Sequence, residues 1–141
     1  MSVEFFLDSN ILVYQASNQD SQKARIAEKL VIDAAKGMGA ISYQVVQETM
    51  NVLLRKNLLP VGDEVAKLYL QNVLAPLCKV QYSPALLLSA LEVRSRYQYG
   101  FYDSLIIAAA LEVGCKVLYS EDLQDGQVIE GLAIKNPFAL A

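Results

Sequence analysis

The amino-acid sequence predicts an α/β domain, a three-layer α/β/α sandwich in which a short, mainly parallel central sheet is covered by helices on both faces. Short apolar segments of strand length alternate with longer segments whose apolar residues recur at helical spacing. That alternation is typical of parallel sheets enclosed by helices. The chain has 141 residues, of which 54% are hydrophobic. Since that length suits one domain with its own core, we expect a single domain over residues 1–141.

The first elements follow from short-range signals. Residues 3–7 are apolar and aromatic apart from Glu4, as in a buried strand. The polar residues 8–10 after them favour a helix start, so a short helix is expected over 11–14. Apolar side chains recur at helical spacing over residues 22–36, before two glycines that end the helix. Residues 40–42 are expected to form a second short strand.

Prolines delimit the middle of the chain. A helix is expected over residues 43–56, terminated by Pro60, and another over 61–74, closed by Pro76. Residues 79–82 are a candidate third strand. Both helices are also candidate partner surfaces, because the mean hydropathy of +0.28 is high for a small monomer.

The C-terminal elements begin with a cap residue followed by proline, which starts a helix over residues 83–97. The next helix, over 103–113, is apolar on nearly every side and is therefore expected to be buried. Residues 116–119 are a strand of the buried type, 120–126 a polar turn, and 132–134 a last short strand.

Composition excludes several classes of protein. The chain has no histidine, which removes Ser-His-Asp and Cys-His catalysis and the usual zinc enzymes. A net charge of -3 argues against a bulk cationic nucleic-acid binder. Cys78 and Cys115 lie far apart in apolar surroundings, which favours buried thiols in a reducing compartment. With no secretory signal and no apolar run of membrane-spanning length, we expect a cytoplasmic protein that does not enter a membrane.

Four acidic residues are placed where they can act together. Asp8 and Asp122 follow strands that end at the same edge of the predicted sheet, and Glu48 and Asp103 lie on helices that flank it. Taken singly, each has a structural explanation as a helix cap, a solvated helix face, a first-turn acid or a turn residue. Converging carboxylates repel one another unless a cation neutralises them, and a site of oxygen ligands suits Mg²⁺ or Mn²⁺.

The segments around these acids resemble the four acidic motifs of PIN-domain ribonucleases, and most closely those of VapC-type toxins from type II toxin–antitoxin pairs. The resembling segments are Asp8-Ser9-Asn10-Ile11-Leu12-Val13-Tyr14, Val45-Val46-Gln47-Glu48, Tyr102-Asp103-Ser104-Leu105-Ile106 and Ser120-Glu121-Asp122-Leu123-Gln124-Asp125-Gly126. The similarity covers essentially the whole chain. It implies a PIN-like fold, cleavage of single-stranded RNA with Mg²⁺ or Mn²⁺, a homodimer, and a cognate antitoxin protein that covers the site.

The resemblance also implies roles for individual residues. The catalytic acids would be Asp8, Glu48, Asp103 and Asp122. The metal ligands would be Asp8, Asp103 and Asp122. Asn10 and Ser120 have the chemistry of hydrogen-bonding residues that hold those carboxylates in place. Asp125 is an alternative to Asp122, and Glu121 is close enough to complicate a mutational test. Whether one or two metal ions take part is left open.

Basic and aromatic side chains are the candidates for holding the RNA. The densest basic pairs are Arg55, Lys56, Arg94 and Arg96. They are either a track for backbone phosphates or solvated helix ends, with Glu92 and Arg96 at i,i+4 spacing. The aromatic residues at 97, 99, 101 and 102 either stack on unpaired bases or belong to the core or an interface, and we favour the latter.

Two other functions are compatible with the acids. A phosphatase of the haloacid-dehalogenase type also uses a strand-end aspartate, but such enzymes have a second aspartate two residues later, where this chain has Asn10. The other alternative is a non-catalytic RNA- or protein-binding module on a PIN-like fold. Binding of RNA without metal and without product would support that module.

Overall fold

A computed structural model describes residues 3–17, 19–59 and 62–139 of the chain. Its strands are β1 (Phe5–Leu7), β2 (Gly39–Ser42), β3 (Cys78–Val80), β4 (Val117–Tyr119), β5 (Val128–Ile129) and β6 (Leu132–Lys135). They form one sheet in the order β3-β2-β1-β4-β6-β5. Only β5 runs antiparallel to its neighbour among these six strands. The predicted α/β class with a short, mainly parallel sheet is confirmed.

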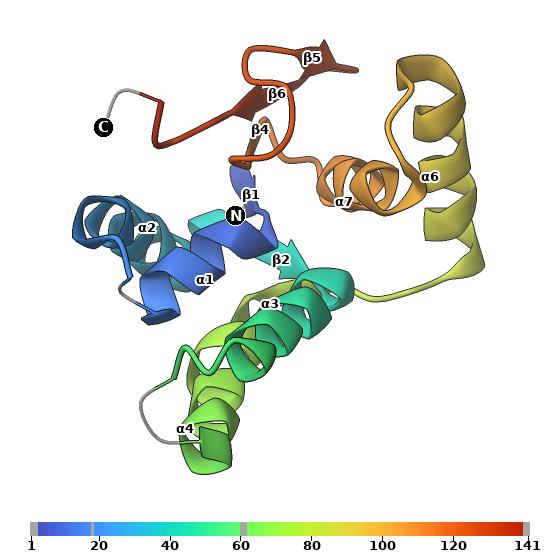
Figure 1. Cartoon of the computed structure of the whole chain (residues 1–141). Coiled ribbons are helices and arrows are strands. Elements are labelled where there is room, and N and C mark those ends of the chain that lie inside the picture. Colours follow the sequence, from blue (N-terminus) through green and yellow to red (C-terminus); the bar gives the residue numbers. More distant parts are fainter. Residues whose placement is uncertain (1–2, 18, 60–61, 140–141) are drawn as a thin grey trace.

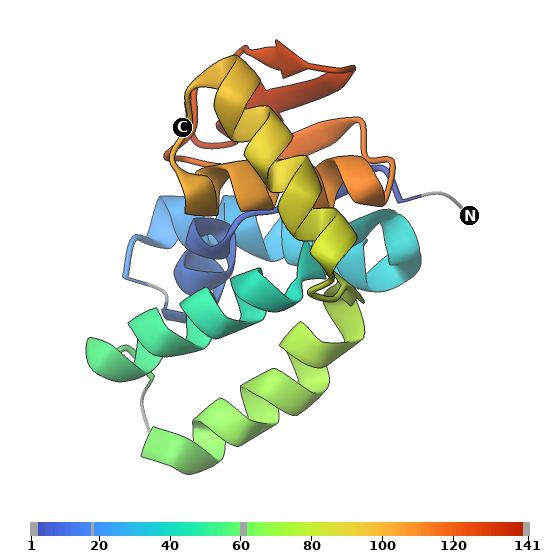
Figure 2. The same cartoon turned by 90° about the vertical axis from the view of Figure 1, so that its right-hand side faces the viewer.

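The helical segments are α1 (Ser9–Ser17), α2 (Ser21–Asp33), η1 (Ala34–Met38), α3 (Tyr43–Arg55), α4 (Gly62–Tyr69), η2 (Leu70–Leu74), α5 (Ala75–Leu77), α6 (Pro84–Tyr97) and α7 (Phe101–Glu112). Figure 1 shows α1 and α2 on one face of the sheet and α6 and α7 on the other. The helices α3 and α4 form a hairpin that projects beyond the β2 side of the sheet, as the turned view in Figure 2 shows.

The central strands are continuous apolar segments in the sequence because their residues belong to the hydrophobic core. All three residues of β1 are buried, because helices cover both faces of the sheet. Residues 104–110 of α7 are buried without interruption, as predicted for a helix that is apolar on nearly every side. Ser83 caps α6, its hydroxyl accepting a hydrogen bond from the backbone N–H of Leu86, and Pro84 takes the first helical position as predicted.

Several boundaries differ from the prediction. The helix predicted to close before Pro76 continues to Leu77 through a π-helical turn. Pro76 is tolerated there because it lies in the first turn of a helical segment, where the N–H group that proline lacks would have no partner within the helix. The helix predicted over residues 22–36 packs through Ala24, Ala27 and Val31, whereas Ile26 and Leu30 are only half-buried. The expected roles of Pro60 and residue 61 lie outside the described residues.

The first helix is longer than predicted, because the helix expected over 11–14 extends over the whole of α1. Strand β5 was not predicted. Cys115 is buried as expected, but Cys78 is only half-buried, and both are free thiols. No helix in the described ranges combines the length and apolar character needed to cross a membrane.

Candidate active site

The candidate site lies where the two central strands β1 and β4 end. The strands run parallel with Leu7 opposite Tyr119, so the residues that follow them, Asp8 and Ser120, are neighbours. The backbone N–H of Asp8 donates to the carbonyl of Tyr119 at 3.0 Å. The hydroxyl of Ser120 donates to Oδ2 of Asp8 at 2.7 Å. The carboxyl ends of these strands thus place one buried carboxyl group at the edge of the sheet.

Asp8 is held in an environment that disfavours its charge. Only 6% of the residue is exposed. Burial, the largest effect, raises the pKa of Asp8 to about 6, and the negative charges of Glu48 and Asp122 act in the same direction. The hydrogen bonds from the Ser120 hydroxyl and from the backbone N–H of Ser9, at 2.7 Å, oppose that rise in pKa. The contact with Ser9, the first residue of α1, also places the carboxyl group of Asp8 at the start of that helix.

Glu48 reaches the site from α3, where it is half-buried. The side-chain amide nitrogen of Gln44 donates to Oε2 of Glu48 and to the backbone carbonyl of Tyr102, both at 3.1 Å. Gln44 therefore joins the helix that carries Glu48 to the first turn of α7. The sequence analysis did not single out Gln44, whose side chain is buried. Its contact with Tyr102 joins residues 58 positions apart, so no local pattern signals it.

Asp103 and Asp122 are both exposed and complete the acidic group. Partial burial and the nearby charge of Asp122 raise the pKa of Asp103. Oδ2 of Asp122 accepts a hydrogen bond from the side-chain amide of Asn10 at 3.2 Å, and Oδ1 of Asn10 accepts one from the backbone N–H of Glu121 at 3.3 Å. Asn10 thus links α1 to the loop that carries the fourth acid.

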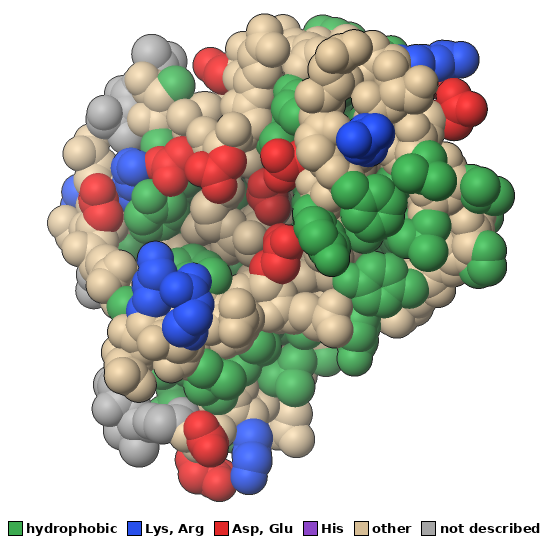
Figure 3. All heavy atoms as spheres, turned by 45° about the vertical axis from the view of Figure 1, so that its right-hand side comes forward, with side chains coloured by type: hydrophobic (Ala, Val, Ile, Leu, Met, Phe, Trp, Pro, Cys, Tyr) green, Lys and Arg blue, Asp and Glu red, His purple; other side chains and the backbone are tan. Residues whose placement is uncertain are grey.

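The structure brings all four predicted acids to one end of the sheet. The charges of Glu48 and Asp122 act on Asp8, and that of Asp122 acts on Asp103. Figure 3 shows the acidic side chains as a band across one face of the molecule. Within the described ranges, no three acidic side chains are close enough together to hold a metal ion as they stand.

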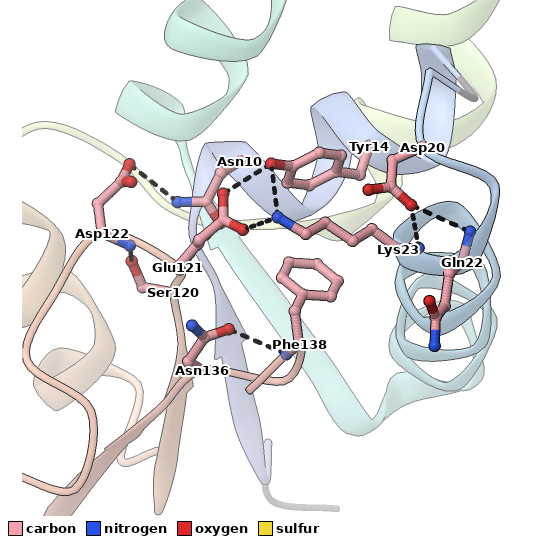
Figure 4. Close-up of polar contacts among 10 residues, drawn as sticks. All are labelled: Asn10, Tyr14, Asp20, Gln22, Lys23, Ser120, Glu121, Asp122, Asn136 and Phe138. Carbon is pink, nitrogen blue, oxygen red and sulfur yellow. Dashed lines mark hydrogen bonds and ion pairs between the residues drawn. The ribbon is translucent and has the colours of Figure 1, made fainter. Parts of the chain in front are cut away.

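Glu121 and Asp125, the other two acids of the fourth motif, each contact residues outside the group of four candidate acids. The carboxylate of Glu121 accepts a hydrogen bond from the Tyr14 hydroxyl at 2.7 Å and forms an ion pair with Lys23 of α2. Figure 4 shows this network beside Asn10 and Asp122. The Lys23 ammonium also lies 4.9 Å from the ring centre of Tyr14 and 5.5 Å from that of Phe138. Sequence reasoning missed Lys23, which lies 98 positions from Glu121.

Asp125 has a structural contact of its own. Its Oδ1 accepts a hydrogen bond from the backbone N–H of Asn136 at 2.8 Å. That contact fastens the loop after β4 to the segment that follows β6. The carboxylate of Asp125 is therefore occupied at the turn, whereas that of Asp122 contacts Asn10.

The four basic candidates divide into two groups. Arg55 and Lys56 are exposed at the end of α3, and Lys56 lines an open pocket of about 290 Å³ together with Asn10 and Asp122. Arg94 and Arg96 lie in the last turn of α6, where Arg94 is exposed. Arg96 pairs with Glu92 at 3.7 Å and lines a different hollow. That hollow is also lined by Glu112 and Glu130 but by none of the four candidate acids. Lys56 is thus brought to the acidic site, and Arg96 forms the predicted i,i+4 pair on another surface.

Comparison with known proteins supplies independent findings. A model of the PIN domain family matches residues 5–124. A toxin–antitoxin complex from Klebsiella pneumoniae has a TM-score of 0.69 at 18% identity, covering 96% of this chain and 98% of that chain. No curated protein sequence matches this one.

Two further solved structures share the fold. The first is VapC20 from Mycobacterium tuberculosis, described as a toxin that cleaves the sarcin-ricin loop, with a TM-score of 0.64 at 20% identity over 84% of this chain and 90% of that chain. The second is VapBC2 from Rickettsia felis bound to a promoter DNA fragment, with a TM-score of 0.66 at 21% identity over 95% and 98% of the two chains. At these identities the likeness concerns the fold.

Proposed function

This chain belongs to the PIN-domain family, and from that premise we propose that it is a Mg²⁺- or Mn²⁺-dependent endoribonuclease that cleaves single-stranded RNA. The observation that carries the proposal is the group of four acids at the carboxyl end of the sheet, with buried Asp8 among them. The similarity of fold to a toxin that cleaves RNA, VapC20, supports the same activity.

The donor set fits a hard divalent cation. Every predicted ligand is a carboxylate, and Asp8, Asp103 and Asp122 are the residues that would hold the ion. Burial raises the pKa values of Asp8 and Asp103, and repulsion from the neighbouring carboxylates adds to that rise; a bound cation relieves this repulsion. Bound there, a metal ion would lower the pKa of a water molecule and neutralise charge on the phosphate.

The remaining residues hold the carboxylates in position and orient the substrate. Ser120 and the backbone of Ser9 fix both oxygens of Asp8, and Asn10 holds Asp122. Glu48, fixed by Gln44, is placed to orient the attacking water. Lys56 lines the pocket beside Asn10 and Asp122, where it can bind a backbone phosphate without reading the sequence of bases.

The test of this proposal is cleavage of a mixed pool of single-stranded RNA with Mg²⁺ or Mn²⁺, and again with EDTA. We expect metal-dependent products from the wild type and none from folded Asp8→Asn. Asp125→Asn is the matched control, because it makes the same chemical change on a carboxylate that contacts the Asn136 backbone and should leave cleavage intact. Wild-type turnover by Asp8→Asn would contradict the proposal, and metal-independent retention of RNA without products would favour a non-catalytic binding module.

We also propose that the protein is the toxin of a toxin–antitoxin pair, expressed together with an antitoxin protein that covers the acidic site. Support comes from the similarity of fold to proteins described as components of toxin–antitoxin complexes. Expression of the chain alone in a bacterial host should arrest growth, and the Asp8→Asn variant should not. Equal growth with both proteins, at equal levels of folded chain, would argue against a toxin.

A homodimer is the second part of this assembly proposal. The predicted helices at 43–56 and 61–74 expose Leu54, Leu68 and Leu70, but α6 also presents apolar side chains that the sequence analysis did not single out. These are Leu87, Leu88 and Leu91, of which Leu88 is 65% exposed. Exposed leucines on one helix favour a partner surface. Light scattering should give a dimer for the wild type and a monomer for Leu88→Glu, and a monomeric wild type at micromolar concentration would contradict it.

A further inference from the structure

Three exposed tyrosines from separate parts of the chain meet beside the acidic group. Tyr43 is the first residue of α3, Tyr82 precedes α6, and Tyr102 lies in the first turn of α7. Their exposed fractions are 44%, 44% and 67%. The rings of Tyr43 and Tyr82 are 5.9 Å apart, edge to face. We call these three residues the tyrosine platform.

The platform adjoins Glu48. The pKa of Tyr82 is raised by partial burial and by the nearby charge of Glu48, with Tyr102 and Tyr43 contributing in the same direction. The ring contact between Tyr43 and Tyr82, and the hydrogen bonds from Gln44 to the carbonyl of Tyr102 and to Glu48, also bring these residues together. Figure 3 shows hydrophobic side chains, a class that includes tyrosine, bordering the acidic band on the side away from a cluster of Lys and Arg.

Two side chains of α3 fix the platform to the site. The hydroxyl of Tyr82 donates to Oε1 of Gln47 at 2.8 Å. Gln44 donates both to the carbonyl of Tyr102 and to Glu48. The positions of Tyr82 and Tyr102 are therefore coupled to the same helix that carries Glu48, while much of each ring surface stays open to solvent.

We propose that the tyrosine platform stacks on unpaired bases of the RNA next to the phosphate that is cleaved, so that Tyr43, Tyr82 and Tyr102 position the substrate. This inference rests on the proposed ribonuclease function. It names the part of the substrate that this surface binds.

The chemistry of the surface favours bases over a protein partner. Exposed aromatic rings beside a phosphodiester-cleaving site offer flat faces on which any base can stack. The platform adjoins the proposed cleavage site, so its occupant during turnover is the substrate, whereas the antitoxin proposed above covers this site only when cleavage is blocked. Along α3, Glu48 lies between Tyr43 of the platform and Lys56 at the end of the helix, and Lys56 shares a pocket with Asp122. A strand with a base on the platform and a phosphate on Lys56 would therefore pass these acids.

The aromatic residues that are exposed for base stacking differ from those that the sequence suggested. Tyr97, Tyr99 and Phe101 are half-buried and pack against the core, as the sequence analysis favoured. Of the four aromatic residues at 97, 99, 101 and 102, only Tyr102 is exposed, and no sequence pattern links it to Tyr43 and Tyr82. These two come within reach only after β3 pairs with β2 and brings their following residues together.

The experiment uses RNA of about 12 nucleotides, a length within the usual range for single-strand sites, with random sequence around one central 2-aminopurine. Binding is measured on the full chain with the Asp8→Asn change, so that bound RNA is not cut. Stacking should quench the 2-aminopurine fluorescence. We expect Tyr102→Leu to abolish the quenching and weaken binding about tenfold, and Tyr102→Phe to retain both.

The comparison of leucine with phenylalanine separates stacking from simple apolar contact. If the platform instead binds a protein, Tyr102→Leu should bind that protein about as well as Tyr102→Phe does. Quenching of the 2-aminopurine fluorescence should then be the same with and without an aromatic ring at position 102. In the cleaving protein, Tyr102→Leu should raise KM with kcat nearly unchanged. Equal RNA affinity and KM for Tyr102→Leu and the wild type would overturn the proposal. So would a Tyr102→Leu variant that becomes monomeric while its RNA affinity stays unchanged, because the platform would then be a protein interface.

Failure of this inference can be told apart from failure of the proposed function. If the wild type cleaves RNA with metal but the tyrosine variants bind and cut as it does, only the platform is refuted. If the wild type never cleaves, the ribonuclease assignment fails first. Tyr82→Leu provides a second variant in case Tyr102→Leu does not fold, because Tyr82 precedes α6 whereas Tyr102 belongs to the first turn of a buried helix.

Discussion

The hydroxyl of Ser120 donates a hydrogen bond of 2.7 Å to Oδ2 of Asp8, across the ends of two neighbouring parallel strands. The same hydroxyl oxygen accepts hydrogen bonds from the backbone N–H groups of Asp122 and Leu123, at 3.2 and 3.4 Å. Ser120 is fully buried. One hydroxyl therefore joins the buried acid that follows β1 to the loop that carries the fourth acid.

Replacing Ser120 with alanine should impair both the site and the fold. The change leaves Oδ2 of Asp8 without its partner, which raises the pKa of Asp8 further and costs about 1–3 kcal/mol of unfolding free energy. Cleavage and Mn²⁺ affinity should each fall about 10- to 100-fold, as is usual when a residue that orients a ligand is lost. Urea unfolding, calorimetry and initial rates measure the three effects.

Ser83→Ala is the matched control for Ser120→Ala. The Ser83 hydroxyl caps α6 by accepting from the backbone N–H of Leu86 at 3.0 Å, so its loss should cost about 1 kcal/mol. It contacts none of the acids through that bond, and cleavage should be unchanged. If both variants lost activity in proportion to stability alone, Ser120 would have no role of its own in positioning Asp8.

The charge of Asp8 should make the metal-free protein less stable as pH rises. Its pKa is about 6 in the folded protein and about 3.8 when unperturbed, so the folded state holds this proton more tightly than the unfolded state. Stability from this group is therefore present below about pH 4 and is lost as pH rises through about 6. The difference in pKa corresponds to at most about 3 kcal/mol.

Asp8→Asn isolates that contribution because asparagine carries no charge at any of these pH values. In EDTA, the unfolding free energy of Asp8→Asn relative to the wild type should increase between about pH 4 and pH 8, by up to about 3 kcal/mol. Urea unfolding at a series of pH values measures it. A difference that stayed constant with pH would show that burial does not hold the Asp8 carboxyl protonated in this range.

The sequence predicted the positions of the acids better than the contacts that hold them. Asp8 and Asp122 follow strands, and the rule that parallel strands end at one edge was sufficient to bring them together. Lys23 and Gln44 could not be found in this way, because each acts through a partner far along the chain, Glu121 in one case and Tyr102 in the other. Such pairings depend on how helices pack on the sheet, which periodicity does not specify.

Local signals were also reliable for helix starts and weaker for helix ends. Ser83 and Pro84 marked the beginning of α6 because capping is a local interaction. The chain passed beyond the predicted stop at Pro76 through a π-helical turn. The two-residue strand β5 exists only through its pairing with β6, so its short sequence offered no pattern to detect.

The ion pair between Lys23 and Glu121 should hold the loop of the fourth acid in place. Lys23→Met removes the charge while keeping an apolar side chain against the rings of Tyr14 and Phe138. Because both side chains of the pair are partly exposed, we expect only a small loss of stability. Mn²⁺ affinity measured by calorimetry should fall severalfold, because the backbone N–H of Glu121 also donates to Asn10, which holds Asp122.

A charge exchange provides the specific control for this pair. Lys23→Glu alone places two carboxylates together and should be worse than Lys23→Met, whereas the double variant with Glu121→Lys should recover part of the Mn²⁺ affinity. Additive effects of the two single changes would mean that the ion pair itself does not position the loop.

Lys56 and Arg94 should differ in their effect on RNA binding. Lys56 lines the pocket beside Asn10 and Asp122, whereas Arg94 is an exposed residue of the last turn of α6. Lys56→Ala should weaken binding of single-stranded RNA and lower the slope of log affinity against log salt by about 0.7, the loss of one phosphate contact. Arg94→Ala should leave the slope unchanged. Fluorescence anisotropy of labelled RNA at several salt concentrations decides between them, and equal slopes for both variants and the wild type would remove Lys56 from the substrate path.

Gly39 at the start of β2 is required by packing, and alanine there should destabilise the whole sheet. Its backbone, with φ of -125° and ψ of 162°, suits any residue, so the restriction is steric. An added Cβ would lie 2.5 Å from a ring carbon of Phe5 and 2.6 Å from Cβ of Ala34, and both neighbours are buried. We expect Gly39→Ala to lower the unfolding free energy by about 1–3 kcal/mol, as overpacked cores do. Gly100→Ala, where a Cβ would meet no atom within 4 Å, should stay within about 1 kcal/mol of the wild type in the same urea titration, and equal stability of all three proteins would mean that Phe5 yields without cost.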